Sequence, residues 1–418
     1  MFEFLKSNWR LAGILALVVA ATMVGSRERS AAQAPAKNKR GDSKTPPKTD
    51  AEVGQPPAPP PAARPAPGML RPLASIPAHA PATSFALVSG DGRRMFTGGS
   101  DGFVQVWNLE TGELQETLGS HDAAITSGAL SRDGKLLVTG GHDRTVRLWN
   151  LEMLEPEATL IGHTDSVMAA VFSPDGKTIA SSGNDRVFRL WKRETRELTF
   201  TSPQQDLTVT RVAFSPDGKL LATGAGKIME WRLPSEVKLW NVESGEELAE
   251  LPGHATNINT IVFSPDGKRI ATGTAEGILH VWDAATRTET SATNFRTGVR
   301  TIAFFPDNQT VAVGQWPGRI FLWNIDTKQR EATYTGYENP KAMVDMLVLS
   351  PDGSLLVSAA DDGVVNFWPV PINSEDGKRQ FWKPPAGKKP ATVELVRRWK
   401  PAAREADSNA ADSPRKKE

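Results

Sequence analysis

The sequence predicts an all-β fold, a single seven-bladed β-propeller in which seven four-stranded sheets stand around one axis. Tryptophan recurs with spacings of 42, 42, 49, 42, 41 and 45 residues, at Trp107, Trp149, Trp191, Trp240, Trp282, Trp323 and Trp368. A second marker, Asp followed by Gly or Asn, keeps step with it, at Gly92, Gly134, Gly176, Gly218, Gly267, Asn308 and Gly353. Two markers that share one period in the low forties indicate repeated blades made of short strands.

One repeat shows how the residues build four strands. Val167–Phe172 is a short apolar strand, and Ser173–Lys177 supplies Pro and Gly for a tight turn. Three further strands are expected over Thr178–Ser181, Val187–Trp191 and Glu197–Phe200. Four antiparallel strands cannot bury both of their faces alone. Stacking the sheets around an axis buries both faces and leaves only short outer edges exposed.

The N-terminal residues 1–34 are expected to be a signal peptide or a membrane anchor. Leu11–Val24 is an uninterrupted run of 14 apolar or small residues behind Lys6 and Arg10. This length suits a signal-peptide core better than a spanning helix, which needs about 20 residues. Ala32–Ala34 fits a cleavage pattern, so both cleavage and retention stay open. We expect export to the periplasm or tethering to the outer face of a membrane.

The regions on both sides of the repeats are polar and are expected to be disordered. Residues 35–68 form a linker in which Pro56–Pro67 holds seven prolines, and a proline-rich recognition motif is the alternative. Residues 371–418 form a basic tail; 12 Lys and Arg stand against 7 Asp and Glu from Ile372 onward. A contact of this tail with an anionic partner or a membrane surface is the alternative there.

The chain order predicts how the ring closes. Leu118 and Leu160, which end outer strands, each stand three residues before a histidine, and Ile76 stands three residues before His79. Residues 69–77 therefore have the pattern of an outer strand, although no other strands of a blade precede them in the chain. The chain after Trp368 offers no good outer strand. We expect the N-terminal strand 69–77 to complete the last blade and so to close the ring.

The repeats resemble the WD-repeat β-propeller family over residues 69–370. Gly162-His163 opens one repeat, and Trp282-Asp283 is the dipeptide that gives the family its name; Asn follows most of the other repeat tryptophans. The resemblance implies a structural hydrogen-bond network of His, Ser or Thr, Asp and Trp. It carries over onto His79, Thr97, Asp101, Trp107, His121, Thr139, Asp143, Trp149, His163, Ser181, Asp185, Trp191, His254, Thr272, Glu276, Trp282, Ser358, Asp362 and Trp368.

The network is expected to be most regular in the first three blades. There the offsets from His to Ser or Thr, to Asp and to Trp are 18, 4 and 6 residues without exception. The fourth blade has Gln205 in the place of His, the fifth has Glu276 for Asp, and the sixth has Phe295 for His. We expect the fourth and sixth blades to be the least regular.

Composition excludes several classes of function. The 49 Lys and Arg nearly balance the 48 Asp and Glu, whereas a whole-chain nucleic-acid binder carries a strong basic excess. The absence of cysteine excludes disulfides, thiolate metal sites and cysteine nucleophiles. The recurring His, Ser or Thr and Asp sets serve a repeated scaffold, since an enzyme needs one asymmetric site. We identify no unique polar cluster near the axis, and expect no enzyme, no cofactor, no metal and no nucleic-acid partner.

Departures from the repeat indicate where a partner binds. In the family, the loops that enter each blade and those that join its second and third strands share one rim. We hypothesise a patch on this rim over blades four to seven, made of Ile228, Met229, Trp231, Arg296, Trp316 and Tyr337. The alternative is that Trp231 and Trp316 pack back onto their own blades. The predicted function is a monomeric scaffold for an unknown protein partner outside the cytoplasm. A carbohydrate- or peptide-binding channel is the alternative function.

Overall fold

The structure is a computed structural model that describes residues 69–226, 234–335, 337, 339, 341–373 and 379–381. All regular elements within these residues are strands. Residues 1–68 and 382–418, and with them the predicted signal or anchor, the proline-rich linker and most of the basic tail, lie outside the described residues. Within the described residues no helix is long and apolar enough to cross a membrane.

Six blades follow one another along the chain, each with its strands in sequence order. Blade one contains β3 (Thr83–Val88), β4 (Arg94–Gly99), β5 (Phe103–Asn108) and β6 (Leu114–Ser120). Blade two contains β7 (Ile125–Leu130), β8 (Leu136–Gly141), β9 (Thr145–Asn150) and β10 (Glu155–Ile161). Blade three contains β11 (Val167–Phe172), β12 (Thr178–Gly183), β13 (Phe188–Lys192) and β14 (Leu198–Thr201). Blade four contains β15 (Thr208–Phe214), β16 (Leu220–Gly226), β17 (Glu236–Asn241) and β18 (Glu247–Leu251).

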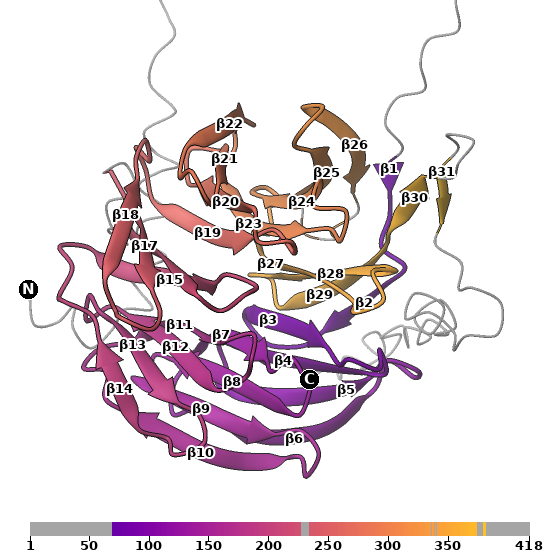
Figure 1. Cartoon of the computed structure of the whole chain (residues 1–418). Helices are drawn as coiled ribbons and strands as arrows, with labels where there is room; N and C mark the ends of the chain where they lie inside the picture. The colour runs from indigo at the N-terminus through magenta and orange to yellow at the C-terminus, as the bar shows by residue number, and fades with distance from the viewer. Residues whose placement is uncertain are drawn as a thin grey trace, which may run out of the picture. The chain divides into compact units, whose positions relative to one another are not determined.

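The remaining blades complete a ring of seven (Figure 1). Blade five contains β19 (Ile258–Phe263), β20 (Arg269–Thr274), β21 (Ile278–Asp283) and β22 (Glu289–Asn294). Blade six contains β23 (Val299–Phe304), β24 (Thr310–Gln315), β25 (Arg319–Asn324) and β26 (Gln329–Tyr334). Blade seven contains β27 (Val344–Leu349), β28 (Leu355–Ala360), β29 (Val364–Pro369) and, from the start of the chain, β2 (Ala74–Pro77). Each inner strand contacts the inner strand of the next blade, and β27 contacts β3. The predicted seven-bladed, all-β propeller is therefore confirmed.

The ring closes through the N-terminal segment, although over a shorter strand than predicted. β2 pairs antiparallel with β29, with Ile76 opposite Val365, and Ile76 is only 4% exposed. The first residues of the expected strand 69–77 do not pair there. Instead β1 (Met69–Leu70) runs parallel to β26, as a fifth strand of blade six. The chain turns between them because Pro72 has no N–H to continue a ladder. One segment thus ties blade six to blade seven.

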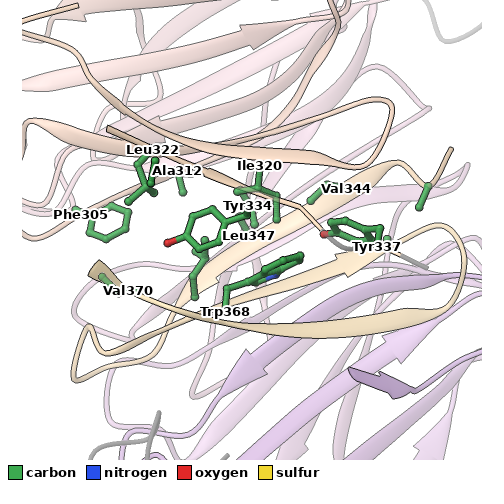
Figure 2. Close-up of a cluster of buried hydrophobic side chains, with 14 residues drawn as sticks. Phe305, Ala312, Ile320, Leu322, Tyr334, Tyr337, Val344, Leu347, Trp368 and Val370 are labelled. Atoms are coloured by element: carbon green, nitrogen blue, oxygen red, sulfur yellow. The ribbon is translucent and has the colours of Figure 1, made fainter. Parts of the chain in front are cut away.

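The hydrophobic core lies between the blades, because each sheet buries both faces against its neighbours. The cluster between blades six and seven shows the arrangement (Figure 2). Tyr334 and Trp368 are fully buried, and their rings meet edge to face with centroids 5.5 Å apart. The Tyr334 hydroxyl donates to the carbonyl of Pro369 at 3.1 Å. The recurring tryptophans are therefore core residues that join sheets.

The turn after each inner strand has the geometry that its residues predict. Ser173 Oγ donates to Asp175 Oδ1 at 2.6 Å, and Gly176 takes the left-handed conformation with a φ of 70°. Asn308 replaces this glycine in blade six and adopts a φ of 60°. Asparagine is one of the few residues that accept this conformation readily. The predicted equivalence of Asn308 and the glycines is confirmed.

Two short strands follow the last blade. β30 (Pro371–Asn373) pairs antiparallel with β31 (Arg379–Phe381) in a separate sheet. This hairpin lies in the region expected to be a disordered tail. Its strands belong to none of the seven blades, so the outer strand of blade seven comes from the N-terminal segment alone.

Candidate functional site

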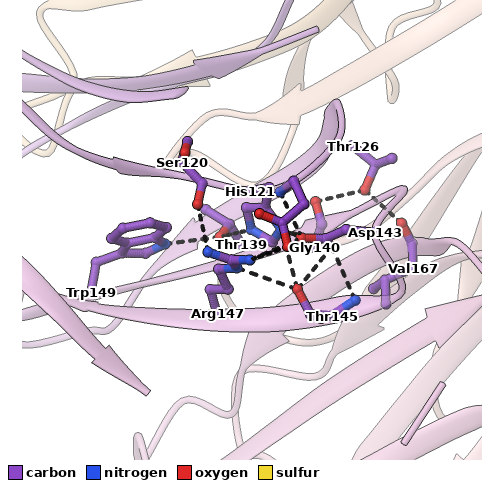
Figure 3. Close-up of polar contacts among 11 residues, drawn as sticks. Ser120, His121, Thr126, Thr139, Gly140, Asp143, Thr145, Arg147, Trp149 and Val167 are labelled. Carbon is purple, nitrogen blue, oxygen red and sulfur yellow. Dashed lines mark hydrogen bonds and ion pairs between the residues drawn. The ribbon is translucent and has the colours of Figure 1, made fainter. Parts of the chain in front are cut away.

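The second blade shows the complete polar network (Figure 3). His121 Nδ1 lies 2.9 Å from Asp143 Oδ2, and its Nε2 lies 2.7 Å from Thr139 Oγ1. Trp149 Nε1 donates to the same hydroxyl oxygen at 2.9 Å. A carboxylate can only accept, so the Nδ1 that faces Asp143 carries a proton. The chain of four side chains runs from the blade surface to its buried indole.

Blades one and three repeat this geometry. In blade one the members are His79, Thr97, Asp101 and Trp107, with hydrogen bonds of 2.8 to 2.9 Å. In blade three they are His163, Ser181, Asp185 and Trp191, with hydrogen bonds of 2.8 to 3.0 Å. The structure thus brings together every residue that the sequence assigned to these three sets.

The carboxylates of Asp143 and Asp185 are held in their ionised form. Burial opposes ionisation of Asp185, but the hydrogen bond and charge of His163 outweigh it and lower the pKa of Asp185 to about 2. Arg189 adds an ion pair of 2.6 Å to the same carboxylate. The pKa of Asp143 is lowered further by the equivalent contacts with His121. Each carboxylate is fully engaged by the scaffold, which is the behaviour of a structural group.

Blade five departs from the expected network, and this corrects its assignment. His254 Nε2 lies 2.9 Å from Thr272 Oγ1, but its Nδ1 donates to the carbonyl of Leu251 at 3.0 Å. Within the described residues no hydrogen bond joins Glu276 to His254, and Trp282 Nε1 has no partner. Blade five also differs in His280, whose ring packs against both His254 and Trp282, with centroids 4.8 and 6.2 Å away, while the rings of His254 and Trp282 lie 5.7 Å apart.

Blades four and six replace the histidine in different ways. In blade four Trp240 Nε1 still donates to Thr223 at 2.9 Å, whereas the Gln205 amide turns to the carbonyl of Pro203 and to Lys238 Nζ. In blade six Phe295 packs edge to face on Phe321 and Trp323, so an apolar contact stands where the other blades have polar ones.

Tyr337 belongs to the interior of blade seven, which corrects its place in the expected partner patch. Its side chain is 8% exposed, and its hydroxyl donates to Ser358 Oγ at 2.6 Å, beside the bond from Trp368 Nε1 at 2.9 Å. Burial raises the pKa of Tyr337 well above its usual range. Asp362 Oδ1 accepts from the amide of Val364 in the turn above. Tyr337 therefore takes the place that histidine holds in blades one to three.

Replacing Tyr337 with Phe is expected to lower the free energy of unfolding by about 1–2 kcal/mol, because a buried hydrogen bond to Ser358 is lost. Chemical denaturation measures this loss. Partner capture by the rim should not change, since the ring offers almost no surface. A variant as stable as the native protein would contradict the role of Tyr337 in the network.

Two loops of blade six hold the exposed members of the expected patch. Arg296 lies in the loop that enters the blade and is exposed; Trp316 lies between β24 and β25 and is 51% exposed. The Gln315 side-chain amide donates to the carbonyl of Thr297 at 2.7 Å and ties the two loops together. Ile228, Met229 and Trp231 lie outside the described residues. We call Arg296 and Trp316 the blade-six rim.

The inner strands carry a feature that the sequence analysis missed. Every inner strand has a β-bulge near its start, after the first residue in six blades and after the second in blade four, seen as a shift in its register with the second strand. The bulged residues are Ser84, Thr126, Met168, Thr210, Asn259, Arg300 and Asp345. They form one level around the axis, which we call the hub. Ser84, Thr126 and Asn259 donate to carbonyls of the next inner strand.

One charged cluster stands at the hub, and the expectation that no such cluster exists was wrong. Arg300 Nη2 donates to Asp345 Oδ1 at 2.6 Å between blades six and seven. Arg211, next to the bulge of blade four, donates to the carbonyl of Asn259 in blade five and interacts electrostatically with Arg300 and Asp345. The other six blades have Phe, Ser, Ala, Thr, Thr and Met at the position of Arg211. An arginine at a position that is neutral in the other six blades was therefore the sequence signal that could have revealed this cluster.

The comparison with protein families assigns the repeats. The model of the WD40 family, described as WD domain, G-beta repeat, matches residues 70–108, 112–150, 154–192, 195–231, 245–283, 289–324 and 328–369. The chain belongs to the WD40 family. No curated protein matches it. WD40 propellers are generally non-catalytic scaffolds that bind protein partners. The WD40 match stops at residue 231 and resumes at 245, so β17 of blade four lies outside the matched residues.

The chemistry of the hub cluster favours binding over catalysis. Arg211 and Arg300 are hydrogen-bond donors with a permanent positive charge, and neither is a nucleophile or a general base at neutral pH. Within the described residues no group of three His, Asp or Glu side chains is arranged to hold a metal ion. The WD40 propeller therefore offers two candidate binding surfaces, the blade-six rim and the hub.

Proposed function

We propose that this protein is a non-catalytic scaffold that binds a protein partner through the blade-six rim, outside the cytoplasm. The observation that carries the proposal is Trp316, a large aromatic side chain that is 51% exposed in a loop fixed by Gln315. A few residues carry most of the binding energy in protein interfaces, and tryptophan and arginine are enriched among them. A fixed loop also loses little conformational entropy when a partner binds.

The location outside the cytoplasm is supported by the sequence of the N-terminal segment. Leu11–Val24 behind two basic residues has the order of charges and apolar residues that directs export. The long polar segment before the propeller would let the disc reach a partner at some distance from a membrane. The partner is therefore expected in the extracytoplasmic fraction of the cell.

Replacing Trp316 and Arg296 with Ala is expected to weaken partner binding about tenfold or more, because both side chains have the character of interface anchors. Crosslinking in the extracytoplasmic fraction, followed by affinity measurement with the captured partner, tests this. Met153→Ala is the matched control, since Met153 is 70% exposed on blade two, far along the ring from blade six. Equal binding by the native and doubly substituted proteins would reject the blade-six rim.

A second candidate function is a ligand bound at the hub. The charged side chains Arg211, Arg300 and Asp345 favour it, because this cluster has no counterpart in the other blades. A peptide that carries a carboxylate can form charge-assisted hydrogen bonds with the two arginines, whereas a neutral carbohydrate cannot.

A further inference from the structure

Arg211 is a side chain at the hub that makes no direct ion pair within the described residues. Its Nε and Nη1 donate to the backbone carbonyls of Asn259 and Thr210 at 2.5 and 2.8 Å. Within the described residues no carboxylate oxygen lies within 4.0 Å of its guanidinium nitrogens. Burial lowers the pKa of Arg211 to about 10; the charge of Arg300 lowers it too, and the charge of Asp345 opposes this only in part. An enclosed cation without an ion pair is costly, and an anion placed beside it would remove that cost.

Arg300 is only partly satisfied by the contacts that it makes. Nη2 donates to Asp345, but Nε is buried and has no hydrogen-bond partner within the described residues. Solvent still reaches this pair, because the Arg300 and Asp345 side chains are 31% and 27% exposed. A ligand arriving from solvent can therefore reach Arg300. Arg211 keeps part of its surface exposed although the surrounding strands enclose it, and it lies close enough to Arg300 and Asp345 to interact with both electrostatically.

We propose that Arg211 and Arg300 form a binding site for one carboxylate of a peptide ligand at the hub, and that Asp345 occupies Arg300 until the ligand replaces it. The inference rests on the second candidate function and names its subsite. Guanidinium groups bind carboxylates through paired, parallel hydrogen bonds, and two such groups from blades four and six would hold the anion from two sides. Asp345 acts as an internal competitor for the same donors.

The surrounding acidic groups select a single negative charge. Asp361 lies in the turn between β28 and β29, where its Oδ1 accepts from the amide of Met343 at 2.6 Å, and it interacts electrostatically with Asp345 and Arg300. Burial raises the pKa of Asp361, and the charges of Asp345 and Asp362 raise it further. A phosphate dianion placed here would meet repulsion from these carboxylates, whereas a carboxylate brings half its charge. We therefore expect a carboxylate to bind in preference to phosphate.

The test uses labelled hexapeptides and the full chain. Fluorescence anisotropy compares a peptide of alternating Gly and Glu with one of alternating Gly and Gln, with succinate and phosphate as competitors. Arg211→Gln and Arg300→Gln are each expected to weaken binding of the acidic peptide about tenfold or more. Asp345→Asn is expected to strengthen it about threefold to tenfold, because the competing charge is gone. Succinate should compete and phosphate should compete less.

The matched control is Arg132→Gln, which removes one exposed arginine from a turn of blade two, away from the hub. Arg300→Lys keeps the charge and should retain part of the affinity. If Arg300→Gln fails to fold, Arg211→Gln and Asp345→Asn still decide the question through their opposite signs. Equal binding of both peptides, or a loss of affinity in Asp345→Asn, overturns the carboxylate site while leaving a peptide-binding hub. If neither peptide binds, both the carboxylate site and the peptide-binding hub are overturned.

Discussion

Deletion of Met69–Ala78 is expected to abolish the cooperative unfolding of the propeller. This segment contains β2, the outer strand of blade seven, and Ile76 packs with Val365 and Phe367 in the core between blades seven and one. Without it β29 becomes an unpaired edge, and the contact that closes the ring is lost. Burial of the Ile76 side chain alone is worth about 1.5–3 kcal/mol, and the ladder to β29 adds to this.

Urea unfolding followed by tryptophan fluorescence measures the effect, since six of the seven recurring indoles are buried between sheets. The native chain should show one steep transition, and the deleted chain a broad change without a defined midpoint. Deletion of residues 69–72 is the control. It removes β1 and leaves β2, so one transition should remain at a slightly lower midpoint. An unchanged transition after deletion of residues 69–78 would show that β2 does not close the ring.

The parts of the fold that could be predicted are those that the chain repeats. The offsets that join His121, Thr139, Asp143 and Trp149 recur in the neighbouring blades, and each member needs the others because a buried polar group without a partner is costly. Ring closure could be predicted in a similar way. The chain has an outer strand without a blade at its start and a blade without an outer strand at its end, and the two pair with each other.

The parts that could not be predicted depend on contacts between blades. Arg300 and Asp345 are 45 residues apart, and only the ring brings them and Arg211 to one hub. A one-residue bulge in each inner strand decides which side chain faces the axis, and no residue type marks that bulge in the sequence. Tyr337 shows the same limit: a hydroxyl that completes a buried network and one that faces a partner look alike in a sequence.

Lowering the pH from 6.5 to 4 is expected to destabilise the protein through His254 by about 3 kcal/mol. Burial, with a smaller effect of the His280 charge, lowers the pKa of His254 to about 4 in the folded state, whereas an unfolded chain has a value of about 6.5. Above pH 6.5 the histidine is neutral in both states. Between 6.5 and 4 only the unfolded chain takes up the proton, so the free energy of unfolding falls as the pH falls through this window.

His254→Gln isolates this effect, and the chain itself offers the model, since Gln205 holds the equivalent place in blade four and blade four still forms. The variant should be less stable than the native protein at pH 8, because the bond to Thr272 is altered, but its stability should change less between pH 6.5 and 4. Asp185, with a pKa of about 2 in the folded state, keeps most of its contribution throughout this window and loses the rest in stronger acid. Urea unfolding at several pH values provides the comparison. Parallel pH profiles for the native protein and His254→Gln would mean that His254 takes up its proton as readily in the folded blade as in the unfolded chain.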